Sequence, residues 1–292
     1  MTARLHAIVP RGAPLPVLLP VRGPAPRALT LPLDAAWQRQ ATLAVVALLA
    51  LWLACAEALA QAGMAPPGII ALLWKWTPLI FSGFLFNILI SVLSMAIGTV
   101  AGLALGLLQV SLIGPVRRSA WVVTQFFRNA PWLVLLFYCI LLIPFQLTLF
   151  GITVPFPAWT KAVIGLSLPV MAYVSEFVRG AVRSIPSGQW EAAESLAFSR
   201  FQTMSMVILP QCVKRLLPPW MNLYAILTMA TPLVSIVGVQ EAMTLTRAAL
   251  SSEGRVDLLI PMYLYVLVWF FLYCYPISRL TQRLERRYGR AS

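Results

Sequence analysis

The stretch from Ile80 to Val110 reads IFSGFLFNILISVLSMAIGTVAGLALGLLQV and carries no charged side chain. An α-helix rises about 1.5 Å per residue, so roughly 20 apolar residues are enough to cross the hydrocarbon of a bilayer. We therefore predict a transmembrane helix here. Its extra length indicates that the helix is tilted or that it begins at the membrane interface.

The composition of the chain agrees with a membrane location. Of the 292 residues, 60% are hydrophobic and 11% are charged, whereas a soluble domain has about 25% charged residues. Six apolar stretches are long enough to span, near 41–60, 80–110, 122–147, 160–182, 214–238 and 258–278. Prolines interrupt the fifth, and a span tolerates them when neighbouring helices satisfy the freed carbonyls. The expected fold is an all-α membrane protein with six transmembrane helices.

The positive charges are unevenly distributed among the loops. The formal net charge is +13. With a cytoplasmic N-terminus, 17 of the Lys and Arg residues fall on the cytoplasmic side: Arg4, Arg11, Arg22, Arg27, Arg39, Arg117, Arg118, Arg179, Arg183, Arg200, Lys214, Arg215, Arg279, Arg283, Arg286, Arg287 and Arg290. The other side receives four, which are Lys75, Lys161, Arg247 and Arg255. This asymmetry is typical of multi-pass inner-membrane proteins. It predicts that both termini are cytoplasmic and that the bilayer, not nucleic acid, is the partner of the basic residues.

The segments outside the main apolar region have simple interpretations. Residues 1–36 contain many prolines and scattered arginines, which indicates a flexible basic cytoplasmic tail. Residues 37–82 are expected to hold an extra N-terminal span and a periplasmic linker, and 281–292 a basic cytoplasmic tail. The single histidine, His6, and the separated cysteines predict no metal site.

Small residues recur at every fourth position of the 80–110 stretch. They are Ser94, Gly98, Gly102 and Gly106. This spacing places them on one face of a helix, where a second helix can approach closely. The pattern predicts helix packing and says nothing of a substrate.

A short amphipathic segment between the fourth and fifth spans is the most informative loop. It runs from Ser187 through Glu191, Ala192 and Ala193 to Ala197, and continues to Leu209 and Pro210. The segment favours a short helix, and the alanines four residues apart would form a shallow face that a partner protein could approach. An ordinary interfacial helix would account for the same pattern.

These residues resemble a known family, the permeases of ATP-binding-cassette (ABC) importers. The Glu191-Ala192-Ala193 stretch, with Ile208-Leu209-Pro210 after it, is similar to the EAA loop that couples such permeases to a cytoplasmic ATPase. Three further stretches are similar to the polar amino-acid (histidine/glutamine-type) branch: 127–131 (FRNAP), 176–189 (EFVRGAVRSIPSGQ) and 233–238 (LVSIVG). The resemblance covers roughly residues 83–280, with the EAA loop at about 184–212.

The resemblance implies a five-helix permease core, here preceded by one extra N-terminal span. It also implies a homodimer of ABC ATPases that holds ATP and Mg, a periplasmic solute-binding protein, and a second permease subunit, either the same or a sister chain. The coupling residues would be Glu191, Ala192, Ala193, Ala197, Leu209 and Pro210. The chain departs from the family where Ala197 replaces a common Gly, and where 229–232 (MATP) replaces a common Lys-Asp-Thr-Ser. The second change leaves the charge of the substrate open.

Polar residues within or at the edge of spans are candidates for a translocation path. Arg128, Asn129 and Glu176 are such residues, and a charge at that depth costs about 3 kcal/mol unless it is paired or hydrated. They would either line the path for the substrate or form an ion pair between helices. The sequence leaves both possibilities open.

The sequence also bears on the source of energy. The chain has only three lysines, none after a glycine, so it has no phosphate-binding loop of the Gly-Lys-Ser/Thr type. We expect no catalytic residues and no cofactor in this chain, with ATP hydrolysis on a partner. The alternatives are an ATP-independent secondary transporter or channel, a membrane-embedded enzyme, and a scaffold that assembles partners.

Overall fold

The structure is a computed structural model that describes Ala50 and residues 68–149 and 152–288. The chain divides into two compact units, Met1–Cys55 and Ala56–Ser292, and nearly all described residues lie in the second. The expected basic tail at 1–36 and, apart from Ala50, the expected span near 41–60 lie outside the described residues.

Within the described ranges, four helical segments are long and apolar enough to cross a membrane. They are α2 (Ile69–Gln109), α5 (Ala158–Arg183), the run Arg200–Val237 that contains α8 (Leu209–Ala230), and the run Val256–Arg286 that contains most of α10 (Leu259–Tyr288). α2 begins eleven residues before the expected start, and α10 continues beyond 280 into the segment that we expected to be a tail.

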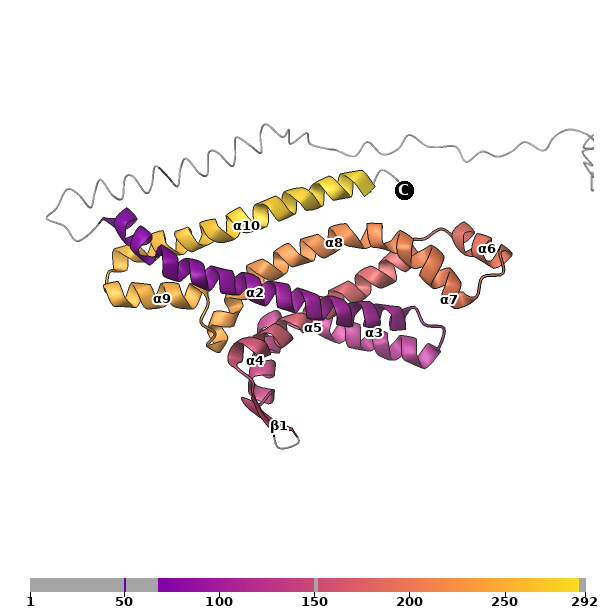
Figure 1. Ribbon diagram of the computed structural model, residues 1–292, viewed down its shortest axis with the longest axis horizontal. Coiled ribbons are helices and arrows are strands. Elements are labelled where there is room, and N and C mark those ends of the chain that lie inside the picture. The colour runs from indigo at the N-terminus through magenta and orange to yellow at the C-terminus, as the bar shows by residue number, and fades with distance from the viewer. Residues whose placement is uncertain (1–49, 51–67, 150–151, 289–292) are drawn as a thin grey trace, which may run out of the picture. The chain divides into compact units, whose positions relative to one another are not determined.

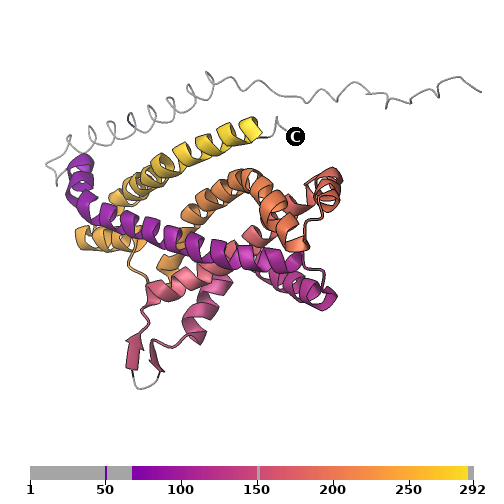
Figure 2. The same ribbon diagram turned by 45° about the vertical axis from the view of Figure 1, so that its right-hand side comes forward.

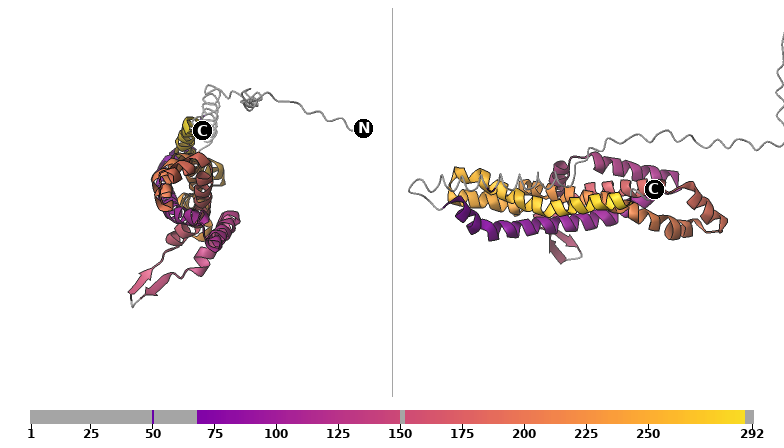
Figure 3. Two further views of the ribbon diagram at one scale, coloured as in Figure 1. Left: turned by 90° about the vertical axis from the view of Figure 1, so that its right-hand side faces the viewer. Right: turned by 90° about the horizontal axis from the view of Figure 1, so that it is seen from above.

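The third expected span, near 122–147, differs from the prediction. Two helices, α3 (Gly114–Asn129) and α4 (Trp132–Leu142), meet there at a bend of 104°, and together they would make a fifth span. The break falls at Ala130, whose backbone is extended (ψ 136°) because Pro131 follows it. A short antiparallel hairpin comes next, β1 (Gln146–Leu149) with β2 (Ile152–Pro155). It projects away from the helices in all views (Figures 2 and 3).

α2 and α5 form the tightest helix pair. Gly98, Gly102 and Gly106 of α2 contact Val170, Val174 and Val178 of α5 in the same order. The two helices therefore run parallel. A Cβ added at Gly102 would lie 2.7 Å from the Met171 carbonyl oxygen, so only hydrogen fits there. Ser94 begins the same stripe and donates a hydrogen bond to the Val163 carbonyl at 3.2 Å. The apolar core lies where α2, α4, α5 and α8 meet, around Leu136, Leu166 and Leu227.

α8 and α10 complete the bundle through aromatic contacts. The Tyr224 hydroxyl of α8 is 2.7 Å from the Tyr273 hydroxyl of α10, and Trp220 of α8 donates to Thr99 of α2 at 2.8 Å. Pro218 and Pro219 lie inside α8 without ending it. The Phe84 ring of α2 packs edge-on against Phe270 of α10, at 5.1 Å between centroids.

The short elements gather at the two ends of the bundle (Figure 1). One end has α6 (Ser187–Ser195), α7 (Arg200–Gln202) and the π-helical turn η1 (Thr203–Ile208). The opposite end has α9 (Ala242–Glu253) and the 3-10 turn η3 (Val256–Leu258), with the 3-10 segment η2 (Thr231–Val237) leading from α8 toward α9. The bundle therefore separates the loop that resembles a coupling helix from α9.

The glycine stripe gives a direct test of helix packing. We expect Gly102→Ala to lower the melting temperature of the purified protein in detergent, because overpacking of a close contact costs about 1–3 kcal/mol. Gly180→Ala is the matched control, since an added Cβ in that part of α5 meets nothing within 4 Å. The control should melt at or slightly above the wild-type temperature. A Gly102→Ala protein as stable as the wild type would contradict the close approach of α2 and α5.

Candidate functional site

The loop that resembles a coupling helix folds as α6, and Ala193 faces its own chain. Glu191 and Ala192 are exposed, whereas Ala193 is 2% exposed and α6 packs on η1. The expectation that Ala193 offers a shallow face to a partner is therefore wrong. The small side chain lets α6 approach the neighbouring turn.

Ala197 ends α6 in a left-handed conformation, with φ at 56°. Its N–H donates to the Glu194 carbonyl at 2.9 Å, and the N–H of Phe198 donates to the Ala193 carbonyl at 3.1 Å. This pair of bonds is a Schellman motif, which normally has glycine at the left-handed position. The alanine side chain is strained there by about 1–2 kcal/mol.

The loop exposes two large apolar side chains among polar ones. Leu196 is 69% exposed and Phe201 is 80% exposed. Ser199 and Gln202 form a capping box at the start of α7, the short helix that contains Phe201. Leu209 and Pro210, expected as part of the loop, are instead the first residues of α8. Exposed apolar patches with a polar rim are typical of protein docking sites.

A separate apolar cluster anchors the loop to the bundle. Ile208 and Cys212 are buried against Val178, Val182 and Ile185 at the end of α5. The Gln211 amide donates to Gln189 of α6 at 3.0 Å, which joins α6 to α8. A displacement of α6 would therefore be transmitted to α5 and α8.

The candidate residues for the translocation path come together only in part. Glu176 of α5 accepts hydrogen bonds from Arg179 at 2.5 Å and from Arg128 of α3 at 3.5 Å. The Asn129 side chain donates to the carbonyl of Gln125 at 2.7 Å, within its own helix. This geometry links α3 to α5 through a shared carboxylate.

Two buried polar clusters were not anticipated from the sequence. In the first, Gln109 donates to Ser175 at 2.6 Å and to Thr124 at 2.9 Å, so that α2, α5 and α3 meet. In the second, Asn87 donates to Thr231 and to Glu241, each at 3.0 Å. A polar residue in an apolar span, such as Asn87, was the available signal.

Glu241 is the N-cap of α9 and is completely buried. Its carboxylate accepts from the backbone N–H groups of Met243 at 3.0 Å and Thr244 at 2.8 Å, in addition to Asn87. The side-chain amide oxygen (Oδ1) of Asn87 in turn accepts from the backbone N–H of Ala242 at 3.1 Å. These bonds satisfy the first turn of α9 and fix it on α2.

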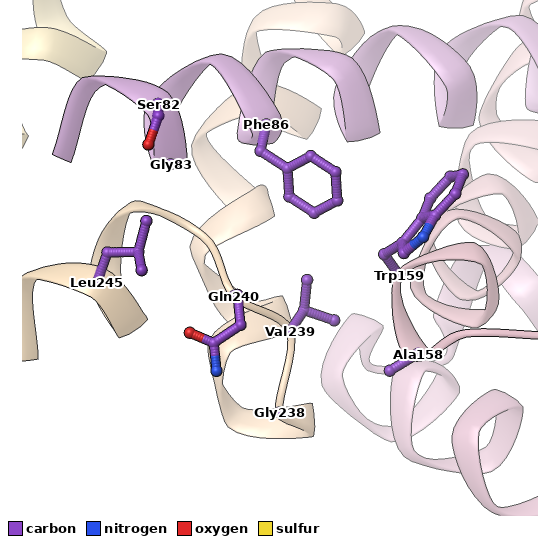
Figure 4. Close-up of a pocket in the computed structure, with 9 residues that line it drawn as sticks. All are labelled: Ser82, Gly83, Phe86, Ala158, Trp159, Gly238, Val239, Gln240 and Leu245. Carbon is purple, nitrogen blue, oxygen red and sulfur yellow. The ribbon is translucent and has the colours of Figure 1, made fainter. Parts of the chain in front are cut away.

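A pocket of about 440 Å³ lies beside this cap, between α2, the start of α5 and the start of α9. The rings of Phe86 and Trp159 form one wall, and Val239, Gln240 and Leu245 form the other (Figure 4). None of its nine lining residues is charged. Among the described residues, no group of His, Cys, Asp and Glu is suited to a metal ion.

An ion pair joins the far ends of α2 and α9. The Glu253 carboxylate accepts from Lys75 at 2.6 Å and from the Trp76 indole at 2.8 Å. These two hydrogen bonds hold the pKa of Glu253 below its usual value, and the bond from Lys75 has the larger effect. α9 is thus attached to α2 at both of its ends.

Comparison with known proteins identifies the family of the chain. Residues 97–290 match the family model described as "Binding-protein-dependent transport system inner membrane component". The chain belongs to this family. It is therefore a membrane-embedded permease without catalytic activity, and ATP hydrolysis in such systems occurs on a separate subunit.

Individual relatives agree with the family. The chain is 35% identical over 212 residues to the probable amino-acid ABC transporter permease protein YckA of Bacillus subtilis, covering 73% of this chain and 90% of that protein. It is 31% identical to the glutamine transport system permease protein GlnP of Escherichia coli, covering 74% and 95% respectively. The crystal structure of an amino acid ABC transporter with histidines superposes with a TM-score of 0.64 at 27% identity, covering 76% of this chain and 99% of that one.

The strained turn after α6 predicts a stabilising substitution. Ala197→Gly should raise the melting temperature of this permease in detergent, because glycine adopts the left-handed conformation without a Cβ clash and removes about 1 kcal/mol of strain. Ala192→Gly is the control, since it places glycine inside α6 and should destabilise by about 1 kcal/mol. A lower melting temperature for Ala197→Gly would argue against the left-handed turn.

The ion pair of Glu253 predicts a pH dependence. Because its folded pKa is lowered, its contribution to stability is complete above the ordinary carboxyl pKa of about 4.3 and is lost as the pH falls through the lowered value. The melting temperature of Glu253→Gln should thus lie below wild type at neutral pH, and the difference should shrink in acid. Glu194→Gln should show no such change. A constant difference for Glu253→Gln across this range would contradict the ion pair.

Proposed function

We propose that the chain is a permease subunit of an ABC importer that moves an amino acid or a related small amine from the periplasm to the cytoplasm. Family membership and the amino-acid permeases among its relatives support this substrate class. The observation that carries the proposal is the pair of exposed apolar side chains, Leu196 and Phe201, that follow α6 at the end of the bundle opposite α9. No described feature favours an ATP-independent transporter.

The proposed orientation places α6 on the cytoplasmic side of the bacterial inner membrane. Basic residues gather at the α6 end, including Arg183, Arg200 and Lys214, whereas Lys75 and Arg255 lie near α9. The positive-inside rule favours this orientation. Adding one N-terminal span near 41–60 to the five core spans would bring both termini to the cytoplasmic side. The proposed domain bounds are a basic tail at 1–36, a periplasmic linker within 37–82, the permease domain at 83–280 and a basic tail at 281–292.

The partners follow from the family. A cytoplasmic ATPase pair would hold ATP and Mg, a periplasmic solute-binding protein would deliver the amino acid, and a second permease subunit would complete the path. Coupling requires that the state of the ATPase and the state of the cavity influence each other by a reciprocal free energy. Glu191, Ala192, Leu196 and Phe201 would make the contact, and Ala193 and Ala197 would hold its shape. Leu209 and Pro210 would connect it to α8.

The proposed motion runs through α5 and α8. Closure of the ATPases would displace α6, and the cluster around Ile208 would transmit the displacement to both helices. Arg128 and Glu176 link α3 to α5, so the bent helix would follow this movement. Together with Asn129 they remain candidates for the lining of the path.

The apolar surface provides the test, because a bulky residue at buried Ala193 would disturb folding as well as docking. Phe201→Asp should reduce co-purification of the ATPase from native membranes at least about tenfold, since a charge must be desolvated in the contact, while the chain still inserts. Val256→Asp is the matched control, because Val256 is 85% exposed at the opposite end. Mass spectrometry of the complex purified in mild detergent measures both.

Two results would contradict the proposal. A chain that purifies without any ABC ATPase, under conditions that keep another ABC importer intact, would overturn the importer function. Equal recovery of the ATPase with Phe201→Asp and wild type would leave the importer but exclude this surface as its coupling contact.

A further inference from the structure

The pocket beside α9 has a distinctive chemical character. Its volume of about 440 Å³ lies within the range of small-molecule sites, which are mostly apolar with a few polar groups. Phe86 and Trp159 meet edge to face, with ring centroids 6.1 Å apart. This aromatic wall comes from two different helices, α2 and α5, that the glycine stripe holds in place.

The polar groups of the pocket are few and neutral. Ser82 donates its hydroxyl to the Leu79 carbonyl at 2.7 Å. The Gln240 amide has no hydrogen-bond partner within residues 68–149 and 152–288, and it lines the side opposite the aromatic wall (Figure 4). Gln240 is therefore the one lining side chain with free donors and a free acceptor.

The nearest buried charges are already occupied. Glu241 follows Gln240, but its oxygens accept from Asn87, Met243 and Thr244 and it is fully buried. Lys161 follows Trp159 by two residues, is also fully buried, and lies over the Phe145 ring at 3.2 Å from the centroid, with the Ile140 carbonyl at 3.4 Å. Neither residue lines the pocket.

A charged ligand group would find no opposite charge among the nine lining side chains. Burial of an unpaired charge is far more costly than burial of a neutral amide or an apolar group. The N-terminus of α9 cannot attract an anion either, because Glu241 and Asn87 already bind its N–H groups. The pocket thus favours an apolar or neutral polar group over a cation or an anion.

We propose that this pocket receives the uncharged side chain of the transported amino acid. The aromatic wall would contact its apolar part, and the Gln240 amide would bond to a polar group when the side chain has one. The charged ends of the amino acid would stay in water at the mouth. This inference rests on the proposed function and adds a substrate class, amino acids with uncharged side chains.

Saturation-transfer NMR of the permease–ATPase complex in nanodiscs, without the binding protein, tests the proposal. The probes are L-phenylalanine, L-leucine, L-glutamine, L-lysine and L-glutamate. We expect saturable signals, strongest on side-chain protons, from one or more uncharged probes only. Trp159→Ala should weaken this binding at least about tenfold, the effect of a lost apolar contact in a specificity pocket.

Two further variants separate the pocket from general damage to the fold. Trp121→Ala removes an exposed tryptophan of α3 outside the pocket and should bind as the wild type does. Gln240→Glu changes an exposed side chain, so the fold should persist. Its added carboxylate should weaken binding of uncharged probes and strengthen binding of L-lysine, a reversal that simple loss of structure would not give.

The outcomes are distinct. Equal or stronger binding of L-lysine or L-glutamate to the wild type, or unchanged binding by Trp159→Ala, would overturn the pocket assignment. So would the absence of any amino-acid signal in a complex that performs ATP-driven uptake with its binding protein, as expected if a lipid chain fills the pocket. If the assembled complex takes up no amino acid with ATP, the proposed function fails and this inference fails with it.

Discussion

The close approach of α2 and α5 is the contact on which the other features depend. In a bilayer, helices gain little from burying apolar surface, so they associate through tight packing and polar contacts. The stripe from Ser94 to Gly106 lets the backbone of α2 reach the valine ridge of α5. This parallel pair carries both the aromatic wall of the pocket and, at the end of α5, the apolar seat of the α6 loop. The two regions are thus connected by one stiff unit.

Buried polar groups place the remaining elements around this pair. Asn87 binds both the start of α9 and the beginning of η2, and Gln109 joins α2 to α3 and α5. Each of these hydrogen bonds adds little net stability to the fold. Removing one partner is strongly destabilising, because in a low-dielectric interior the group left unpaired cannot bond to water. Such contacts make the positions of α9 and α3 specific, whereas apolar packing alone would tolerate sliding.

Local patterns in the sequence predicted the main helices and the glycine stripe, since both depend on residues close in the chain. α5 and the start of α10 lie within two residues of their expected bounds. The 104° bend was missed, although the polar residues Arg128 and Asn129 and then Pro131 marked the place. The orientation of Ala193 and the bonds of Glu241 with Asn87, 154 positions away, depend on tertiary contacts. No local spacing encodes them, so the geometry of the candidate site could not be predicted from the sequence.

The π-helical turn η1 constrains the number of residues in its segment of the chain. Thr203–Ile208 lies within an otherwise continuous helical run, Arg200–Val237, and each residue of an α-helix turns the chain by about 100°. A π-turn accommodates one residue more than regular helix would, so a one-residue deletion could restore an unbroken α-helix without harm to its hydrogen bonds. It would also swing Phe201 and all of α6 around the axis of α8. Evolution can therefore vary the residues of this segment more freely than it can vary their number.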